Sequence, residues 1–101
     1  MPRYLNIGGL IAAGFDESGK YLLTISHSGR GVFAVGTWER LARDSEPAYP
    51  SGGRVAGIGP INGQLIQVVE KNFQTDELRL TAPDGAFSLI YQSGVVEISE
   101  A

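Results

Sequence analysis

Ser26-His27-Ser28 is the segment whose residue types come closest to those of a nucleophilic catalyst. Together with Asp44 it supplies a hydroxyl, an imidazole and a carboxylate, the three groups of a serine-hydrolase triad. The segment is expected to end a strand, where adjacent side chains point to opposite faces, so Ser26 does not meet His27. The sequence also lacks a Gly-x-Ser-x-Gly elbow. We therefore predict no catalytic residues, and a His27 ring that is hydrogen-bonded beside a turn.

Arg30 stands between two glycines, in a stretch (Ser28-Gly29-Arg30-Gly31) that is predicted to be a turn. The backbone amides of a turn, together with a guanidinium group, can hold a carboxylate or a phosphate. The glycine spacing matches neither a Walker loop nor a dinucleotide fingerprint, both of which need further glycines and a following helix. We expect an exposed turn arginine, and the alternative is a small-molecule or anion site that Arg30 shares with His27.

A cluster of large residues follows in the sequence and forms the best candidate for a binding surface: Trp38, Arg40, Arg43 and Tyr49. Tryptophan, tyrosine and arginine are the residue types that dominate the energetics of protein interfaces. The loop that carries Tyr49 comes shortly after the other three and can fold over them. The simpler alternative is that Trp38 belongs to the core and that the arginines pair with nearby carboxylates.

Metal and cofactor sites are not predicted. The sequence has no cysteine and a single histidine, which leaves no thiolate or multi-histidine metal site within one subunit. No Asp-x-Asp-x-Asp-Gly calcium loop is present either. With neither a cofactor motif nor a catalytic cluster, the sequence favours a protein that is not an enzyme.

These residues are positioned by a chain that glycine and proline punctuate at short intervals, with 14 and 5 copies. Such punctuation between apolar runs predicts many short strands. In residues 20–27, the odd-numbered Tyr21, Leu23 and Ile25 are expected on one face and the even-numbered residues on the other. Strands are predicted at residues 3–14, 20–27, 32–35, 64–70, 77–81, 87–91 and 95–98.

The predicted fold class is all-β, a small antiparallel barrel or sandwich of seven to eight short strands in a single domain over residues 1–101. Residues 38–43 are ambiguous. Trp38, Leu41 and Ala42 fit a helical stripe, whereas strict alternation over the same residues fits a strand, so a short helical turn and an edge strand both stay open. Residues 45–54, rich in proline, glycine and serine, are predicted to be a loop.

An internal echo links two parts of the chain. The first copy is Gly19, Tyr21, Leu23, Ile25 and Ser28-Gly29, and the second is Gly85, Phe87, Leu89, Tyr91 and Ser93-Gly94. The spacing slips from 66 to 65 residues between the ends of the copies, which indicates a one-residue deletion. Ancestral duplication and the similar appearance of any two hairpins both explain the echo.

Charge and hydropathy limit the kinds of binding partner and the cellular location that the sequence favours. The formal net charge is −3, which disfavours nucleic-acid binding because that needs clustered basic residues. No run of about 18 apolar residues predicts a membrane-spanning helix. A basic segment followed by an apolar run, typical of a secretory signal, is not seen at residues 1–6, and together with the lack of cysteine this favours the cytoplasm.

Part of the chain resembles a known family. The runs Asp16–Leu23, Gly31–Val35 and Thr37–Glu39 are similar to the "D-x-x-G-x-x-L … V-x-V-x-T" pattern of one blade of a WD-repeat-like β-propeller. The resemblance covers residues 15–44, and Pro83-Asp84-Gly85 repeats the opening turn of the blade. The chain lacks the WD dipeptide, and four to eight blades of about 40–45 residues do not fit in 101 residues. The chain as a whole resembles small bacterial proteins of uncharacterised function, which implies no activity.

The sequence therefore favours a non-enzymatic binding or interaction module, for example a bacterial accessory or immunity-type protein that blocks a partner. The predicted partner is another protein, or a second copy that forms a homodimer through an edge strand or an apolar face. The alternative is a small-molecule or anion-binding β-barrel, or a weak enzyme, whose mouth is lined by His27 and Arg30.

Overall fold

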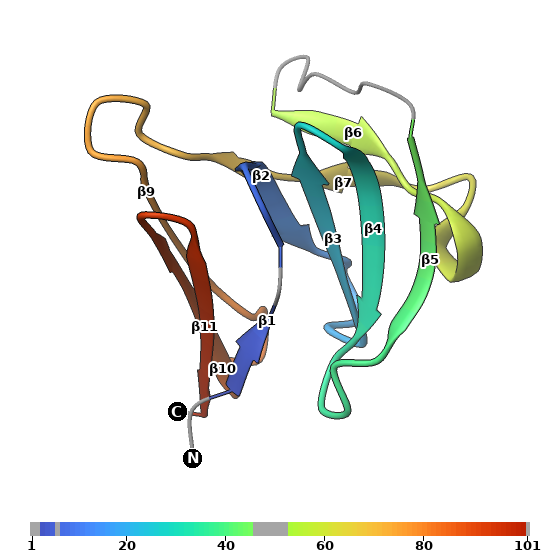
Figure 1. The fold of residues 1–101 in the computed structure, drawn as a ribbon. Coiled ribbons are helices and arrows are strands. Elements are labelled where there is room, and N and C mark those ends of the chain that lie inside the picture. The colour runs from blue at the N-terminus through green and yellow to red at the C-terminus, as the bar shows by residue number, and fades with distance from the viewer. Residues whose placement is uncertain (1–2, 6, 46–52, 101) are drawn as a thin grey trace.

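The computed structural model describes residues 3–5, 7–45 and 53–100, which form three β layers (Figure 1). The all-β class is confirmed, and every strand pair between these residues is antiparallel. Sheet A has the order β1 (Arg3–Leu5), β11 (Val95–Glu100), β10 (Phe87–Gln92) and β9 (Glu77–Thr81). Sheet B has the order β5 (Arg40–Asp44), β4 (Gly29–Ala34), β3 (Tyr21–Ser26), β2 (Leu10–Phe15) and β8 (Val69–Glu70). The third layer is the hairpin of β6 (Arg54–Ala56) and β7 (Leu65–Gln67), with the 3-10 turn η1 (Gly59–Ile61) between its strands.

The structure contains eleven strands within its described part, where seven or eight were expected. Two predicted strands are each divided in the structure: residues 3–14 form β1 and β2, and residues 64–70 form β7 and β8, which belong to different sheets. The further strands are the edge strand β5 and the three-residue β6. The one helical piece in that part of the chain is η1, so no helix there is long and apolar enough to cross a membrane.

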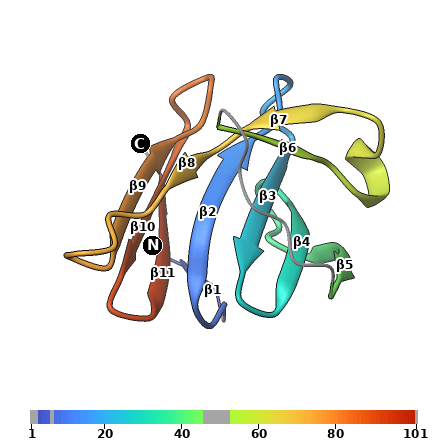
Figure 2. The same cartoon turned by 90° about the horizontal axis from the view of Figure 1, so that it is seen from above.

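Sheet B is the middle layer and has a hydrophobic core on each face. The first core lies between sheets A and B, and the second lies between sheet B and the third layer. Leu22 belongs to the first core, whereas Leu23 and Ile25 belong to the second, so the predicted alternation along β3 is confirmed. The third layer touches the sheet directly, because a Cβ added at Gly14 in β2 would lie only 2.1 Å from the Gln67 carbonyl oxygen in β7 (Figure 2).

The turn predicted at residues 28–31 lies elsewhere. Ser26 pairs directly with Gly29, which makes His27 and Ser28 the two-residue loop and places Arg30 inside β4. The glycine at position 29 serves a close approach rather than a turn tip, since a Cβ there would lie 2.0 Å from the Asp44 carbonyl oxygen in β5. Sequence reasoning assigned the turn by composition and missed this contact between strands.

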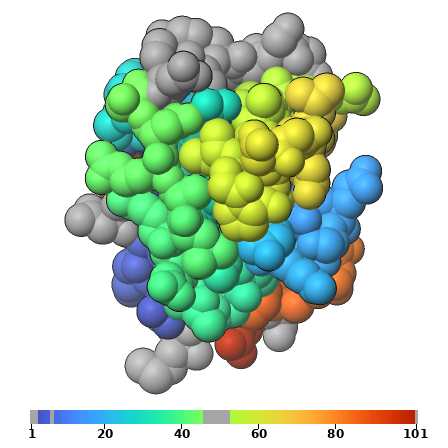
Figure 3. Space-filling model, turned by 90° about the vertical axis from the view of Figure 1, so that its right-hand side faces the viewer, coloured from blue at the N-terminus to red at the C-terminus, as the bar shows by residue number. Residues whose placement is uncertain are grey.

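The prediction for residues 38–43 left a helical turn and an edge strand open, and the structure has the edge strand β5 from Arg40 after a tight turn. Trp38 has a φ of 59° and its N–H donates to the Ala34 carbonyl at 2.7 Å, which closes that turn. A bulge at Leu41, between Arg40 and Ala42, then resets the pairing with β4. The helical turn of the structure is η1, whose Gly59 sits against Ala42 of β5, so the two surfaces adjoin in Figure 3.

Two three-stranded meanders repeat each other at a spacing of 66 residues. Tyr21 pairs with Ala34 across β3 and β4, and the residues 66 positions later, Phe87 and Glu100, pair across β10 and β11. The pairing of β2 with β3 and that of β9 with β10 keep the same spacing. The echo in the sequence therefore corresponds to equal strand registers in the structure.

The turns that open the two meanders are also alike. Gly19 N–H donates to the Asp16 carbonyl at 3.0 Å, and Gly85 N–H donates to the Ala82 carbonyl at 2.9 Å. Both glycines have a positive φ, 74° and 75°, which only glycine adopts without strain. The opening turns of the meanders thus share one backbone conformation.

The one-residue deletion expected in the echo is not present in the structure. The hairpin loops are residues 27–28 and 93–94, which are equal in length and again 66 residues apart. The two Ser-Gly pairs of the sequence occupy different places, since Gly29 begins a strand whereas Gly94 lies in a loop. Matching dipeptides by eye had shifted the second copy by one residue.

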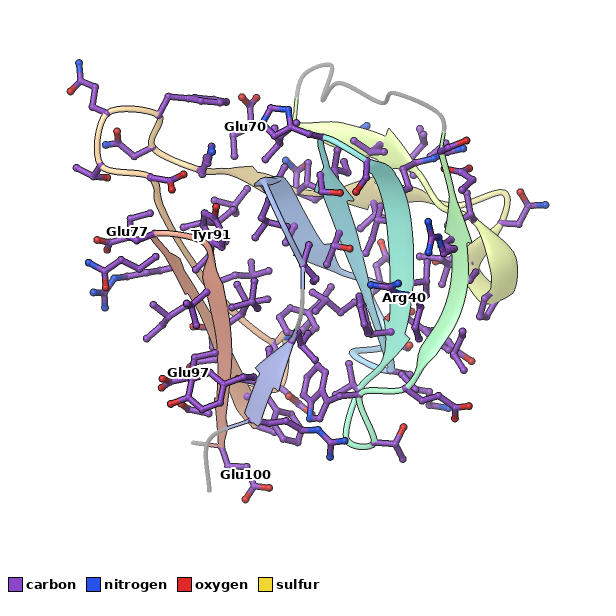
Figure 4. All side chains as sticks on the ribbon, in the orientation of Figure 1. Arg40, Glu70, Glu77, Tyr91, Glu97 and Glu100 are labelled. Atoms are coloured by element: carbon purple, nitrogen blue, oxygen red, sulfur yellow. The ribbon has the colours of Figure 1, made fainter. Side chains whose placement is uncertain are left out.

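The two meanders face the same way in the stack. The face of sheet B that packs on sheet A therefore corresponds to the face of sheet A that points outward. Leu22 and Phe33 are buried on the face of sheet B that meets sheet A, and their counterparts Ser88 and Ser99 lie on the outer face of sheet A. Figure 4 labels Glu97 on that outer side. The same face also carries the exposed side chains of Tyr4 and Val95, so it is mixed rather than wholly polar.

Candidate functional site

A cavity of about 180 Å³ opens on sheet B, on the face that also holds the first core. It lies beyond Phe33, where the described residues of β9, β10 and β11 contribute nothing to its walls. Strands β3, β4 and β5 form its floor and rim, and the link between β1 and β2 forms one wall. The lining residues are Ile7, Gly8, Thr24, Ser26, Ser28, Gly29, Arg30, Gly31, Arg40, Arg43 and Asp44.

The hollow exists because the floor of the cavity is made of small residues. Gly31 lies in the ladder between Thr24 of β3 and Arg43 of β5. A Cβ at Gly31 would lie 3.2 Å from the Thr24 hydroxyl oxygen and 3.7 Å from the Phe33 ring. Any larger side chain at position 31 would therefore occupy the space that the cavity now offers.

Two arginines of the edge strand β5 line the cavity. Arg40 pairs with Phe33 across β4 and β5, and its guanidinium carbon lies 5.2 Å from the centroid of the Phe33 ring, over β4 (Figure 4). Arg43 pairs with Gly31 at the floor. Neither arginine forms an ion pair with a carboxylate among residues 3–5, 7–45 and 53–100. Among the described residues, these two groups therefore add positive charge to the lining that no carboxylate pairs with.

A third arginine is held in a bidentate ion pair. Arg30 Nε donates to Asp44 Oδ1 at 3.2 Å, and its Nη2 donates to Asp44 Oδ2. The remaining Nη1 donates to the Ala56 carbonyl at 3.2 Å, which ties β6 of the third layer to sheet B. The side chains are 13% and 30% exposed, so water screens this pair only in part. Arg30 is therefore a half-buried strand residue and not the exposed turn arginine that was expected.

Three hydroxyl groups complete the polar lining. Thr24 Oγ1 donates to the Gly31 carbonyl at 3.3 Å, which uses its proton within the sheet. Ser26 Oγ lies 3.0 Å from Ser28 Oγ and 3.3 Å from the Gly29 carbonyl. Because a serine has one hydroxyl proton, the Ser28 proton is available to a ligand whenever Ser26 donates to Ser28.

His27 is not among the described residues that line this cavity. It is exposed in the β3–β4 loop, and its backbone N–H donates to the Gly9 carbonyl at 3.2 Å. The imidazole ring lies on Gly9, where an added Cβ would come within 2.6 Å of its Cδ2. No hydrogen bond of the His27 ring is seen among the described residues, in contrast to the prediction, and His27 and Arg30 do not line one cavity together.

The other members of the expected binding surface are dispersed. Trp38 is 6% exposed and belongs to the first core, as the simpler alternative for this residue held. Tyr49 lies outside the described residues. Arg40 and Arg43 are exposed and share the cavity. The carboxylates expected to pair with these two arginines do not do so in the described part of the chain, and Asp44 pairs with Arg30 instead.

The sequence analysis did not predict that Ser26, Ser28 and Gly31 would line one cavity with the two arginines of β5. A signal was present, since Thr24 and Ser26 are polar residues on the same face of β3 as Leu22. Joining them to Arg40 and Arg43 requires the order β3-β4-β5, which the sequence alone does not provide.

A second hollow, a groove of about 590 Å³, lies between the β2–β3 turn and β7. Its lining includes Phe15, Leu65 and Pro83 together with Glu17 and Arg54. Among the described lining residues, the carboxylates of Asp16 and Glu17 outnumber the single guanidinium group of Arg54, so the groove lacks the positive excess of the smaller cavity.

The described residues contain no group of three or more histidine, cysteine or acidic side chains arranged to hold a metal ion. In comparisons with known proteins, no protein-family model, no curated protein and no solved structure matches the chain. The cavity on sheet B is therefore interpreted from its own geometry.

Proposed function

We propose that this protein is a non-enzymatic binding module that captures an anionic group of its ligand in the cavity on sheet B. The observation that carries the proposal is that Arg40 and Arg43 line a cavity that is also lined by hydroxyl groups. Neither arginine is bound to a carboxylate in the described part of the chain. A hydrogen bond to a charged group contributes about 1.5–3 kcal/mol, roughly twice the contribution of a neutral one.

The same geometry argues for binding rather than catalysis. The hydroxyl groups of Ser26 and Ser28 are the candidate nucleophiles of the cavity, and a serine hydroxyl needs an adjacent base to become reactive. His27 does not line the cavity, and Asp44 is engaged by Arg30. The side chains of Arg40 and Arg43 are hydrogen-bond donors without an acceptor site and do not serve as bases. They suit a site that holds an anion without transforming it.

The site is also prepared for a ligand before one arrives. The Arg40 guanidinium is supported by the Phe33 ring, so less side-chain freedom is lost when it binds. The Arg30–Asp44 pair joins β4 to β5 and fixes the distance between floor and rim. A hollow of fixed shape with supported arginines favours affinity through preorganisation.

We further propose that the ligand is carried by a partner protein of a bacterial cytoplasm, with a homodimer as a second assembly. The support is the edge strand β5, where exposed Leu41 lies between the two arginines. Arginine is enriched in interface hot spots, and the net charge of −3 disfavours nucleic acid as the partner.

The test compares two double variants with equal loss of charge. Arg40→Gln with Arg43→Gln removes the proposed site, and Arg54→Gln with Arg79→Gln removes two arginines from other layers. Tagged proteins are used to capture partners from a lysate of the source organism, and acetate, malonate and phosphate are titrated in parallel by calorimetry. The proposal expects the first double variant to lose at least tenfold in anion affinity and to lose any captured partner, while the second binds as wild type. Equal binding by both variants would refute it.

A further inference from the structure

We infer that the group held in the cavity on sheet B is a phosphoryl group, a tetrahedral oxyanion with two negative charges. The inference rests on the proposed function and narrows it to one ligand chemistry. It is drawn from the charge of the lining, from the directions of its hydrogen-bond donors and from the size of the hollow.

The charge of the described lining residues matches a dianion. Arg40 and Arg43 contribute two positive charges, and Arg30 and Asp44 neutralise each other. A single carboxylate would compensate one guanidinium group and leave the other unpaired in a recess. A phosphate monoester carries about two negative charges at neutral pH and compensates both.

The donors come from different sides of the hollow. The guanidinium groups extend from β5, one beside Phe33 and the other beside Gly31. The Ser28 hydroxyl, in the β3–β4 loop, also lines the cavity and can donate to a ligand when Ser26 donates to it. One planar carboxylate presents its two oxygens in a single plane. A phosphoryl group has three terminal oxygens that accept from several directions, which suits this arrangement.

The size of the hollow sets how much of the ligand enters it. Cavities that enclose a whole drug-sized molecule measure about 300–1,000 Å³. The cavity on sheet B measures about 180 Å³ and is open to solvent. It can take the charged group itself while the remainder of the ligand stays outside, over β5 or over the link that carries Gly8.

The experiment measures affinities by calorimetry at constant ionic strength for four probes. Two are phosphate monoesters, N-acetyl-O-phosphoserine methylamide and glycerol 3-phosphate, and two are carboxylates, malonate and acetate. We expect both monoesters to bind at least tenfold more tightly than acetate and more tightly than malonate. Because the second pKa of a phosphate monoester is about 6, we also expect binding about tenfold tighter at pH 7.5 than at pH 5.0. Tighter binding of the phosphoserine probe would identify a phosphorylated protein as the source, and tighter binding of glycerol 3-phosphate would identify a small metabolite.

Two variants locate the site. Arg40→Gln with Arg43→Gln should reduce monoester affinity at least tenfold, with Arg54→Gln and Arg79→Gln as the control. Gly31→Ala keeps both arginines and partly fills the floor, and its backbone is compatible with alanine because its φ is not in the left-handed region. We expect it to lose at least fivefold in affinity while the circular dichroism spectrum stays unchanged. Unaltered monoester binding by a folded Gly31→Ala protein would place the anion outside the cavity and overturn the inference.

The outcomes separate the two proposals. If malonate binds through Arg40 and Arg43 and the monoesters do not, the phosphoryl inference is overturned and the binding module stands. If no probe binds wild-type protein and the arginine variants change nothing, both proposals are overturned.

Discussion

The indole ring of Trp38 meets the phenyl ring of Phe87 edge-on, with 5.3 Å between their centroids and 86° between their planes. Trp38 follows the β4–β5 turn of sheet B, and Phe87 begins β10 of sheet A, so this contact joins the two sheets. Trp38 reaches the contact with a φ of 59°, a conformation that costs a residue other than glycine about 1–2 kcal/mol. The packing of the indole in the first core offsets that strain.

Replacing Trp38 with alanine should destabilise the protein by about 3–5 kcal/mol, the range for removing a buried aromatic side chain. The loss is measured by urea denaturation. Phe73→Ala is the matched control because its ring is 64% exposed, and it should cost less than about 1 kcal/mol. Similar losses for the two variants would show that the Trp38–Phe87 contact does not join the sheets. The Trp38 variant also damages the core, which makes it unsuitable as a probe of binding.

Replacing Asp44 with asparagine should destabilise the protein by about 1–3 kcal/mol, because it removes a charged acceptor from the half-buried Arg30. The loss should persist in 1 M salt, since ions screen a half-buried pair weakly. Glu77→Gln breaks the exposed pair with Arg79 and should cost about 1 kcal/mol or less. Denaturation curves at low and high salt compare the two, and an Asp44 effect that vanishes with salt would contradict the half-buried pair.

Replacing Gly14 with alanine should cost more than about 2 kcal/mol. The new Cβ would lie 2.1 Å from the Gln67 carbonyl oxygen, and a change of rotamer cannot relieve a clash with backbone. Gly8→Ala is the control, because no atom outside its chain neighbours lies within 4 Å of a Cβ there. Thermal unfolding of both variants decides the matter: a stable Gly14 variant would mean that β7 does not rest on β2.

Replacing Asp16 with alanine should preserve the turn that opens the first meander. The buried carboxylate accepts from the Ser18 hydroxyl at 2.6 Å and from Tyr21 N–H at 3.0 Å, yet Ala82 forms the same backbone turn in the second meander without it. We expect a loss of about 1–2 kcal/mol with slow exchange retained at the Gly19 amide. Hydrogen exchange measures this, and fast exchange along β2 and β3 would show that the turn depends on the carboxylate.

The periodic part of the fold was predictable from local pattern. Tyr21, Leu23 and Ile25 alternate with polar and apolar neighbours, and a period of two residues places them on one face whatever the strand pairs with. Arg30 was misplaced because a glycine on each side usually indicates a turn. The reason for Gly29 is the backbone of Asp44, fifteen residues away along the chain, and no local pattern contains that information.

The sequence indicates some residues of the candidate site, but it does not indicate which of them lie together in the structure. Arg40 and Arg43 stood out by type, whereas their meeting with Ser28 and Gly31 follows from the strand order β5-β4-β3. The third layer was missed because β6 has only three residues and because residues 64–70 were predicted as one strand, whereas they divide between β7 and β8. The resemblance of residues 15–44 to a propeller blade stays a prediction, as does the homodimer.

The antiparallel pairing of β1 with β11 has a consequence for the order in which the protein can fold during synthesis. β1 is synthesised before β11 and cannot take its place in sheet A until residues 95–100 have been made. The meander of β2, β3 and β4 joins neighbours in sequence and can pair early. Until β11 emerges, the apolar side chains of Leu22 and Phe33 are uncovered, which exposes the nascent chain to aggregation and makes it a client for chaperones.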